Sequence, residues 1–344
     1  MDSAGIAIKG AILGDGAIHR YRPVGDKRGR NGWYVLHLDG TPAGAAGDYK
    51  RGIKIKWSAK GVTLLTRAER QAFTAKTRAD RERRAEAEAA TQAKAALRAN
   101  AIWNNAKPAP DDHPYLARKA VPSFGLRVSD WVKEWVDGDG EVHTKRVPNA
   151  VLVPICDKGG VIWSLQAILP TGKNALGRDK DFLPGGRKRG LYYVIGKPKD
   201  VGGVTTIIIC EGYSTAAAIH VATGALVVVA FDAGNLVHVA RIFRAKRPQA
   251  RIVVAGDNDA WTQTPIKNPG ATRAAAAAEA VKGIAIIPQF KDVADKPTDF
   301  NDLARLEGLE EVKAQLVAAI SGQPAAPSEA EQDQIRPITV FQGL

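Results

Sequence analysis

Residues 205–231, TTIIICEGYSTAAAIHVATGALVVVAF, contain two continuous apolar runs on either side of an alanine-rich segment. Two later runs, RIVVAG at 251–256 and GIAIIP at 283–288, have the same character. Runs that are apolar at every position are typical of strands buried on both faces of a parallel sheet. The segments between the runs predict helices, at 214–223, 235–246 and 271–282. This alternation predicts a doubly wound parallel α/β sheet over residues 203–322.

The chain before this sheet divides into three segments of different composition. Residues 1–62 alternate apolar or aromatic residues with basic ones between turns, which predicts a small basic β-rich module. Residues 63–108, rich in Ala, Arg, Glu and Lys, predict a long charged helical connector that ends at Pro108. Residues 109–202 contain apolar runs joined by an Asp-Lys-Gly-Gly turn, which predict a β-rich subdomain.

The end of the chain predicts one more helix, from about Asp302. The segment 323–344 contains Pro, Gln and acidic residues and is expected to be a disordered tail. The fold class expected for the whole chain is therefore α/β, with a β-rich module, a charged helix and a β-rich subdomain preceding the doubly wound sheet.

Composition narrows the functional classes. The net charge of +13 is concentrated in residues 1–110, with 21 Lys and Arg against 10 Asp and Glu, which suits a polyanionic partner such as nucleic acid. The two cysteines, Cys156 and Cys210, exclude a four-cysteine zinc site and a disulfide framework. We also expect a cytoplasmic protein that does not enter the membrane, because no apolar run approaches about 18 residues and the N-terminus lacks a signal-peptide pattern.

The basic residues of the N-terminal module are interleaved with aromatic ones. Basic groups for phosphates and aromatic faces for bases are what binding of single-stranded DNA requires, although such aromatics also form the cores of small β modules. The long helix is either a solvated connector or an arm that lies on nucleic acid. The candidate DNA-binding residues are Arg20, Arg22, Arg28, Arg30, Trp33, Tyr34, Lys54, Lys56 and Trp57.

Acidic residues follow three of the buried runs: Glu211, Asp232, and the pair Asp257 and Asp259 in RIVVAGDND. Right-handed crossovers bring consecutive parallel strand ends to one edge of a sheet, where sites form. Converging carboxylates are costly unless a cation lies among them, and oxygen ligands suit Mg²⁺ or Mn²⁺. Taken singly, the aspartate pair also fits a turn or a helix cap, and Glu211 fits the start of a helix.

A glycine-rich basic segment, GRDKDFLPGGRKRG at 177–190, lies before the sheet. It fits either a loop that covers phosphate groups or an exposed turn. Its candidate nucleotide- and phosphate-binding residues are Lys180, Arg187, Lys188 and Arg189.

The motifs IIICEGYSTAAAIHVATG, FDAGNL, RIVVAGDND and TDFNDLARL resemble the toprim fold of primases, topoisomerases and some nucleases. The resemblance is strongest to the primases of plasmids and phages, because HPYLARKAV and FLPGGRKRGLYYVIG also look like the stretch that precedes toprim in those proteins. It covers roughly residues 15–315.

The resemblance implies roles for individual residues. Glu211 corresponds to the toprim glutamate, a general acid/base or metal ligand, and Asp257 and Asp259 to the pair that holds divalent metal. Asp299 or Asp302 corresponds to a further acidic position, although Asp302 also fits the cap of the last helix. The resemblance adds two candidate nucleotide- and phosphate-binding residues. They are Gly212, which would let the backbone turn sharply into a helix, and Asn235, which would contact nucleotide or order the site.

The resemblance implies a DNA primase that makes short primers on single-stranded DNA from nucleoside triphosphates. Two Mg²⁺ or Mn²⁺ ions, and no zinc, are expected as cofactors. A separate replicative helicase is the expected partner, because no G-x-x-x-x-G-K-[ST] motif occurs. A toprim nuclease and a non-catalytic single-strand-binding accessory stay open as alternatives.

Overall fold

The computed structural model describes the chain except for residues 2–3, 27–28, 39–41, 60–65, 137–140, 171–175, 202–203, 265 and 323–344, and describes only the backbone at 69, 199–201 and 204. Arg28 and the tail expected at 323–344 therefore lie outside the described residues. The chain forms two compact units, which we call the N-terminal unit, mainly Met1–Ala90, and the C-terminal unit, mainly Thr91 onward. In the described ranges, none of the helices combines the length and apolarity required to cross a membrane.

The N-terminal unit contains a four-stranded antiparallel sheet in the order β1-β2-β3-β4. Its strands are β1 (His19–Tyr21), β2 (Gly32–His37), β3 (Ala43–Asp48) and β4 (Ile53–Ser58). The core on one face is small and includes Ile6, Tyr21, Tyr34 and Ala46. The β-rich module predicted from the sequence is thus present.

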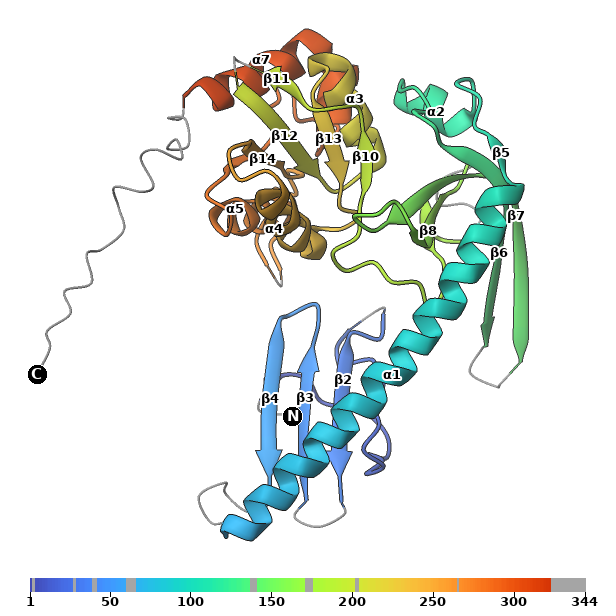
Figure 1. The fold of residues 1–344 in the computed structure, drawn as a ribbon, viewed down its shortest axis with the longest axis vertical. Helices are drawn as coiled ribbons and strands as arrows, with labels where there is room; N and C mark the ends of the chain where they lie inside the picture. Colours follow the sequence, from blue (N-terminus) through green and yellow to red (C-terminus); the bar gives the residue numbers. More distant parts are fainter. Residues whose placement is uncertain are drawn as a thin grey trace, which may run out of the picture. The chain divides into compact units, whose positions relative to one another are not determined.

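Helix α1 (Arg67–Asn105) continues from the N-terminal unit into the C-terminal unit (Figure 1). The helix forms because the segment is rich in good helix formers and contains neither Gly nor Pro. Its last turns are anchored: Ala95 and Ala99 are buried in a cluster with Trp131 and Leu165 of the C-terminal unit. The predicted connector is therefore a helix whose C-terminal part belongs to a packed core.

A five-stranded antiparallel sheet, in the order β5-β6-β7-β8-β9, opens the C-terminal unit. Its strands are β5 (Lys107–Pro108), β6 (Arg127–Val136), β7 (Val142–Cys156), β8 (Ile162–Ile168) and β9 (Lys180–Phe182). A short helix, α2 (Pro114–Lys119), lies between β5 and β6 in the chain.

The second sheet of this unit has the order β10-β13-β12-β14-β15, and β11 pairs with β12. Strands β12, β13, β14 and β15 pair parallel with one another. Strand β10 pairs antiparallel with β13, and β11 pairs antiparallel with β12. The bounds are β10 (Tyr193–Ile195), β11 (Lys199–Val201), β12 (Val204–Cys210), β13 (Leu226–Val229), β14 (Arg251–Ala255) and β15 (Ile284–Ile286).

Helices cover both faces of the parallel sheet, as Figure 1 shows. Alternate strand residues enter different cores: Ile208 packs in the cluster that includes α3, α6 and α7, and Ile209 in the one that includes α4 and α5. The helices are α3 (Tyr213–Thr223), η4 (Ala233–Asn235), α4 (Leu236–Lys246), α5 (Pro269–Glu279), α6 (Phe300–Glu307) and α7 (Leu309–Ser321). The predicted doubly wound α/β sheet is confirmed.

The helix predicted from about Asp302 is present as α6, which begins at Phe300. A second helix, α7, which the sequence did not predict, follows it. Gly308 separates the two with φ of +94°, a conformation that favours glycine and breaks the helix.

The two sheets of the C-terminal unit share one hydrophobic core. Leu116 and Val153 belong to the same cluster as Ile208 of the parallel sheet. The Tyr213 hydroxyl on α3 donates to the carbonyl oxygen of Pro122, at 2.8 Å. The core therefore crosses position 202, where the sequence placed a boundary between two segments.

Candidate active site

The parallel sheet brings acidic residues from three strand ends to one edge. The last residues of β12, β13 and β14 lie in register with one another. Glu211 directly follows β12, Asp232 lies just beyond β13, and Asp257 just beyond β14. Each strand is apolar and buried, so it forms a rigid support for the polar residue that follows it.

Glu211 has a strongly perturbed carboxyl group. Burial is the largest cause, and the negative charges of Asp259 and Asp232 add to it, whereas Lys180 acts in the opposite direction. Together they raise the pKa of Glu211 to about 7. The group therefore changes charge near neutral pH, as a general acid or base must.

Asp257 is perturbed in the same way. Burial and then the charges of Glu211, Asp299 and Asp259 raise the pKa of Asp257 to about 8, against the opposing charge of Lys180. These acids thus act on one another electrostatically, which places them in one site. Without a cation the site holds protons that an ordinary aspartate would lose.

The chemistry of the site fits a divalent cation. Oδ1 of Asp257 is buried and has no hydrogen-bond partner among the described residues. An unpartnered buried carboxylate oxygen is costly, and Mg²⁺ or Mn²⁺ among the oxygens would remove that cost. Within the described ranges, however, no three His, Cys, Asp or Glu side chains already stand where they could hold an ion. Ion binding would therefore require side chains to rearrange.

Asp259 is held by the start of α5. Its Oδ2 accepts a 3.0 Å hydrogen bond from the backbone N–H of Gly270. A Cβ atom at Gly270 would lie 2.3 Å from the carbonyl oxygen of Asp257, so only glycine fits there. Gly270, at the start of α5, therefore contacts both Asp257 and Asp259.

Asn258, between the two aspartates, connects neighbouring loops. Its backbone N–H donates to the carbonyl oxygen of Thr298 at 2.6 Å. Its side-chain oxygen accepts a hydrogen bond from Nδ2 of Asn268, at 2.9 Å. These bonds tie the turn after β14 to the segments before α5 and α6.

Asp299 and Asp302 have different positions. Asp299 caps α6, accepting a 2.8 Å hydrogen bond from the N–H of Asp302, and burial and the charge of Asp302 raise its pKa. Asp302 lies in the first turn, where it accepts from the N–H of Thr298 and lies 3.6 Å from Nζ of Lys119. The helix cap predicted at Asp302 is therefore formed by Asp299. Asp299, and not Asp302, also raises the pKa of Asp257 through its negative charge.

Lys180 brings positive charge to the acids from the neighbouring sheet. It begins β9, and its charge lowers the pKa of both Glu211 and Asp257. Its Nζ would lie 4.0 Å from a Cβ atom at Gly212, the residue before α3. Gly212 has φ of −105°, which any residue adopts, so its backbone does not depend on glycine, and a phosphate or nucleotide contact at Gly212 stays a prediction.

A model of the toprim domain matches residues 206–310. This chain contains a toprim domain. The match includes Glu211, Asp257 and Asp259 at the strand ends and continues through α6.

Curated relatives of this toprim chain include two DNA primases named TraC, both from Escherichia coli. They are 36% identical over 278 residues and 34% identical over 281 residues. Each match covers 80% of this chain but only 24% and 18% of the relatives, so the chain spans a quarter or less of their length. The predicted resemblance to toprim primases of mobile elements is confirmed by these matches.

Two solved primase structures are also similar. The DnaG primase catalytic domain bound to ssDNA is 14% identical to this chain, with a TM-score of 0.46. The match covers 68% of this chain and 83% of that one. The zinc-binding and RNA polymerase domains of the Aquifex aeolicus primase are 10% identical, with a TM-score of 0.43 over 85% of this chain and 80% of that one.

Lys188 brings a second positive charge to the toprim edge. Its Nζ lies 2.5 Å from Oδ2 of Asp232 and 4.4 Å from the ring centroid of Phe182. Two other basic residues predicted to bind phosphate lie elsewhere on the loop. The guanidinium of Arg187 lies over the ring of Trp163, 5.3 Å from its centroid. Arg189 lies near His238, and burial together with the positive charges of Arg189 and Arg241 lowers the pKa of that histidine.

Asn235 holds the segment around Gly190 and Leu191 against the parallel sheet. It is 3% exposed, and its Oδ1 accepts a 2.7 Å hydrogen bond from the N–H of Gly190. Its Nδ2 donates to the carbonyl oxygens of Leu191 and Ala230, at 3.0 and 2.8 Å. The structure thus gives Asn235 an ordering function within the protein, and a contact to nucleotide stays a prediction.

Lys119 was missed as a site residue in the sequence. It ends α2, far from the toprim motifs in sequence, and its charge lowers the pKa of Asp299. Its carbonyl oxygen accepts a hydrogen bond from Nδ2 of Asn301, at 2.7 Å. The only available signal was the HPYLARK motif, whose contact with α6 depends on tertiary packing.

The predicted DNA-binding residues of the N-terminal unit lie on two faces of its sheet. Trp33 pairs with Arg20 and with Gly47, which pairs with Lys54, so these side chains share one face. Tyr34 points to the opposite face, where it is 4% exposed in the core. The prediction that Tyr34 stacks on DNA is therefore not supported by its position.

Other members of the predicted set are exposed. Trp57 is 57% exposed, on the face opposite Trp33. Arg20 and Arg30 each donate a side-chain hydrogen bond to the other's carbonyl oxygen, at 2.9 and 2.7 Å. The exposed side chains also include Arg22, Lys54 and Lys56.

Proposed function

We propose that this chain is a metal-dependent, DNA primase-like nucleotidyltransferase that makes short primers on single-stranded DNA. The observation that carries the proposal is the buried, unpartnered Oδ1 of Asp257, at a toprim edge where Glu211, Asp259 and Asp299 add further negative charge. The names of the TraC relatives support the reaction class.

The cation would be held by Glu211, Asp257, Asp259 and Asp299, which already influence one another's charge. When bound, Mg²⁺ or Mn²⁺ lowers the pKa of a primer 3′-hydroxyl and neutralises charge that develops on the transferred phosphate. Without a cation the pKa of Glu211 is about 7, so its carboxylate exchanges a proton near neutral pH, and a bound cation would displace that proton.

Basic residues would position the nucleoside triphosphate. Lys180 lies among the acids, and Lys188 is paired with Asp232 at the same edge. A triphosphate that binds there competes with Asp232 for Lys188, so Asp232 keeps that lysine in place until nucleotide arrives. Template binding would use the N-terminal unit and its positive charge, and strand separation would come from a separate helicase.

The test is primer synthesis from nucleoside triphosphates on single-stranded templates with Mg²⁺ or Mn²⁺. Replacing both Asp257 and Asp259 by Asn should reduce synthesis by at least about 100-fold, because the ligands are lost. The matched control is Asp292→Asn with Asp295→Asn, two exposed aspartates near α6, which should leave synthesis unchanged.

The nuclease alternative is tested with the same protein. Labelled DNA is incubated with Mn²⁺ and without nucleotides, and strand scission that depends on Asp257 would replace the primase proposal by the nuclease. Primer synthesis that survives in the Asp257→Asn, Asp259→Asn protein would remove the toprim edge from the mechanism.

A further inference from the structure

The beginning of helix α1 is open to solvent although it belongs to the compact N-terminal unit. Among its described side chains, those at positions 67–79 are exposed except for the half-buried Lys76. The helix contacts the sheet through Asp80, which is 7% exposed and whose Oδ2 lies 3.5 Å from Nδ1 of His37. The first three turns are thus joined to the sheet near Asp80, and most of their described side chains face solvent.

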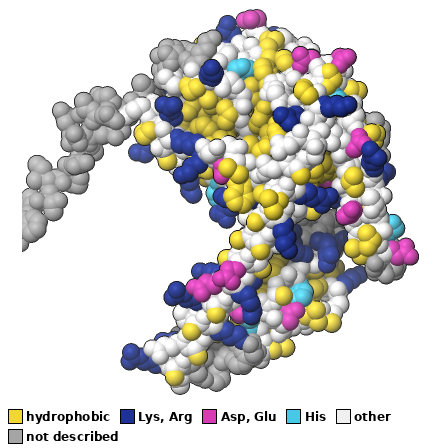
Figure 2. All heavy atoms as spheres, turned by 45° about the vertical axis from the view of Figure 1, so that its right-hand side comes forward, with side chains coloured by type: hydrophobic (Ala, Val, Ile, Leu, Met, Phe, Trp, Pro, Cys, Tyr) yellow, Lys and Arg dark blue, Asp and Glu magenta, His cyan; other side chains and the backbone are white. Residues whose placement is uncertain are grey.

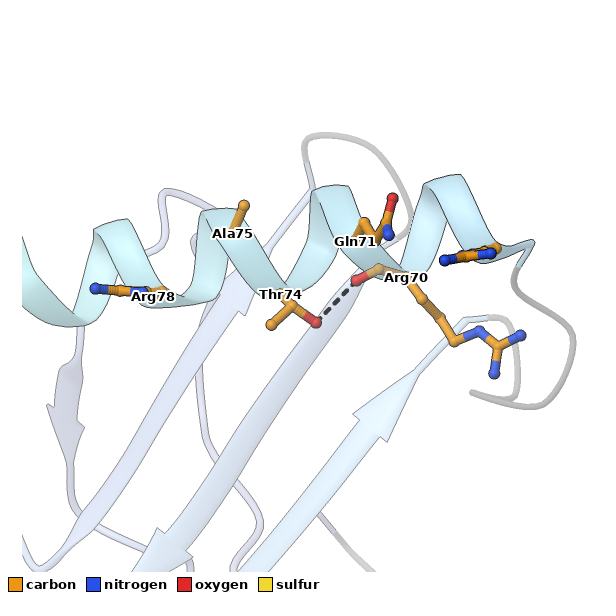
Figure 3. Close-up of a pocket in the computed structure, with 6 residues that line it drawn as sticks. Arg70, Gln71, Thr74, Ala75 and Arg78 are labelled. Carbon is orange, nitrogen blue, oxygen red and sulfur yellow. Dashed lines mark hydrogen bonds between the residues drawn. The ribbon is translucent and has the colours of Figure 1, made fainter.

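A cavity of about 620 Å³ runs along this exposed stretch (Figure 3). It is lined by Arg67, Arg70, Gln71, Thr74, Ala75 and Arg78. These positions follow the three- and four-residue spacing that places side chains on one face of a helix. At 1.5 Å per residue, the arginines at the two ends are about 16 Å apart along the helix axis. We call this surface the arginine groove.

Among the residues that the structure describes, no acidic side chain lines the arginine groove. Arg78 donates through Nε to Glu82, but both side chains are largely exposed, so the pair is weak. Arg67 and Arg70 have no acidic partner in the part of the chain that the structure describes. The guanidinium groups are therefore available to an anion.

The remaining lining residues do not favour an apolar partner. The Thr74 hydroxyl donates to the carbonyl oxygen of Arg70 at 2.8 Å, the bond drawn in Figure 3. Ala75 is the single apolar side chain among the described lining residues. A partner helix would need an apolar stripe, which this groove lacks, whereas a chain of phosphates needs spaced positive charges.

The rest of the N-terminal unit favours a single nucleic-acid strand over other polyanions. Tyr49 is 58% exposed, with the guanidinium of Arg20 4.5 Å from its ring centroid and the ring of Trp33 5.9 Å away. Exposed aromatic rings beside cations suit stacked, unpaired bases. In the space-filling view, dark-blue Lys and Arg side chains are more frequent than magenta Asp and Glu (Figure 2).

We infer that the arginine groove binds the phosphodiester backbone of single-stranded DNA. It is a second binding surface, separate in sequence from the toprim acids, and holds the strand by charge. This inference rests on the proposed function for the identity of the strand as template. Binding itself requires neither nucleotide nor catalysis, so it can fail or succeed independently of primer synthesis.

The experiment measures binding of fluorescently labelled oligothymidylate to the full chain carrying Asp257→Asn and Asp259→Asn, without nucleotides. The test variant adds Arg67→Gln, Arg70→Gln and Arg78→Gln. Each phosphate contact to a single strand contributes about 0.7 to the slope of log affinity against log salt concentration. Loss of three contacts should lower the slope by about 2 and weaken binding on the order of 10- to 100-fold at about 0.1 M salt.

Two further proteins control for folding and for net charge. A variant with Lys at the three arginine positions keeps the charge and should retain most of the affinity. Arg247→Gln, Lys282→Gln and Lys313→Gln remove the same charge from exposed positions of the C-terminal unit, and should leave the slope unchanged. Arg247 and Lys282 precede β14 and β15 and so lie at the sheet edge opposite the acids.

Either an unchanged slope in the groove variant or an equal loss in the C-terminal control would overturn the inference, because binding would then not depend on this surface. Equal loss of affinity in the lysine variant would also overturn it, since charge alone would not explain the effect. If DNA binds through the groove but no primer is made, the proposed catalytic function fails while the binding surface stands.

Discussion

The backbone N–H of Gly270 donates a 3.0 Å hydrogen bond to Oδ2 of Asp259, and Gly270 also lies against the carbonyl oxygen of Asp257. One residue at the start of α5 thus positions both aspartates of the Asp-Asn-Asp motif. The apolar strand β14 delivers the motif to the sheet edge, but α5 determines how the two carboxylates are held.

Gly270→Ala should therefore disturb the site without removing an acid. Its Cβ atom would lie 2.3 Å from the Asp257 carbonyl oxygen, which forces the backbone apart and should cost about 1 to 3 kcal/mol of unfolding free energy. Primer synthesis should fall at least about 10-fold, since small displacements of catalytic groups are costly. The matched control is Gly322→Ala, where the nearest atom is 3.4 Å away. Equal activity of the two variants would contradict the positioning role.

Asn235→Ala should loosen the segment that includes Lys188, Gly190 and Leu191. It leaves the Gly190 N–H and the Leu191 carbonyl oxygen without their partner, which should cost about 2 to 4 kcal/mol. We expect KM for nucleoside triphosphate to rise, because Lys188 loses its fixed backbone. Asn100→Ala serves as control: its Nδ2 donates to the Ile162 carbonyl oxygen away from the site. That variant should lose stability in a urea titration and keep its KM.

Much of the C-terminal unit could be predicted from the sequence, because its strands carry their own signal. Runs such as IVVA at 252–255 are apolar at every position, and a sheet covered on both faces buries them. The acids directly after such runs could then be assigned to one edge, since parallel strands end together.

The contacts that refine the site could not be predicted, because they join segments distant in sequence. The antiparallel pairing of β10 with β13 and the ion pair of Lys119 on α2 with Asp302 on α6 both depend on tertiary packing. The position of Tyr34, in contrast, could have been predicted, because adjacent residues of a strand point to opposite faces. Trp33 and Tyr34 could not both face DNA on one surface, and strand periodicity alone would have shown this.

Ala120, at the end of α2, should tolerate glycine with a gain in stability. It has φ of +52° and ψ of +45°, a left-handed conformation that costs a residue with a Cβ atom roughly 1 to 2 kcal/mol. Glycine also makes the unfolded chain more flexible, which offsets part of this gain. Ala120→Gly should therefore raise the free energy of unfolding by about 0.5 to 1 kcal/mol. Ala117→Gly, inside the same helix, should destabilise it by about 1 kcal/mol. Chemical denaturation of the two proteins checks these opposite signs.

The cation-free protein should become less stable as the pH rises. In the folded state the pKa of Glu211 is about 7 and that of Asp257 about 8, against ordinary values of 4.5 and 3.8. Between about pH 4 and 8 the folded protein binds more protons at these groups than the unfolded chain does. The free energy of unfolding therefore falls as the pH rises through this interval.

Magnesium should reverse this trend, because the cation competes with protons for the same oxygens. Calorimetry in chelator should show a lower Tm at about pH 8 than at about pH 5, and added Mg²⁺ should raise Tm more at the higher pH. The protein with Glu211→Gln and Asp257→Asn keeps the shape of the site without its titrating groups, and should lose both effects. An unchanged pH slope in that protein would assign the trend to other groups and leave the cation site without its electrostatic basis.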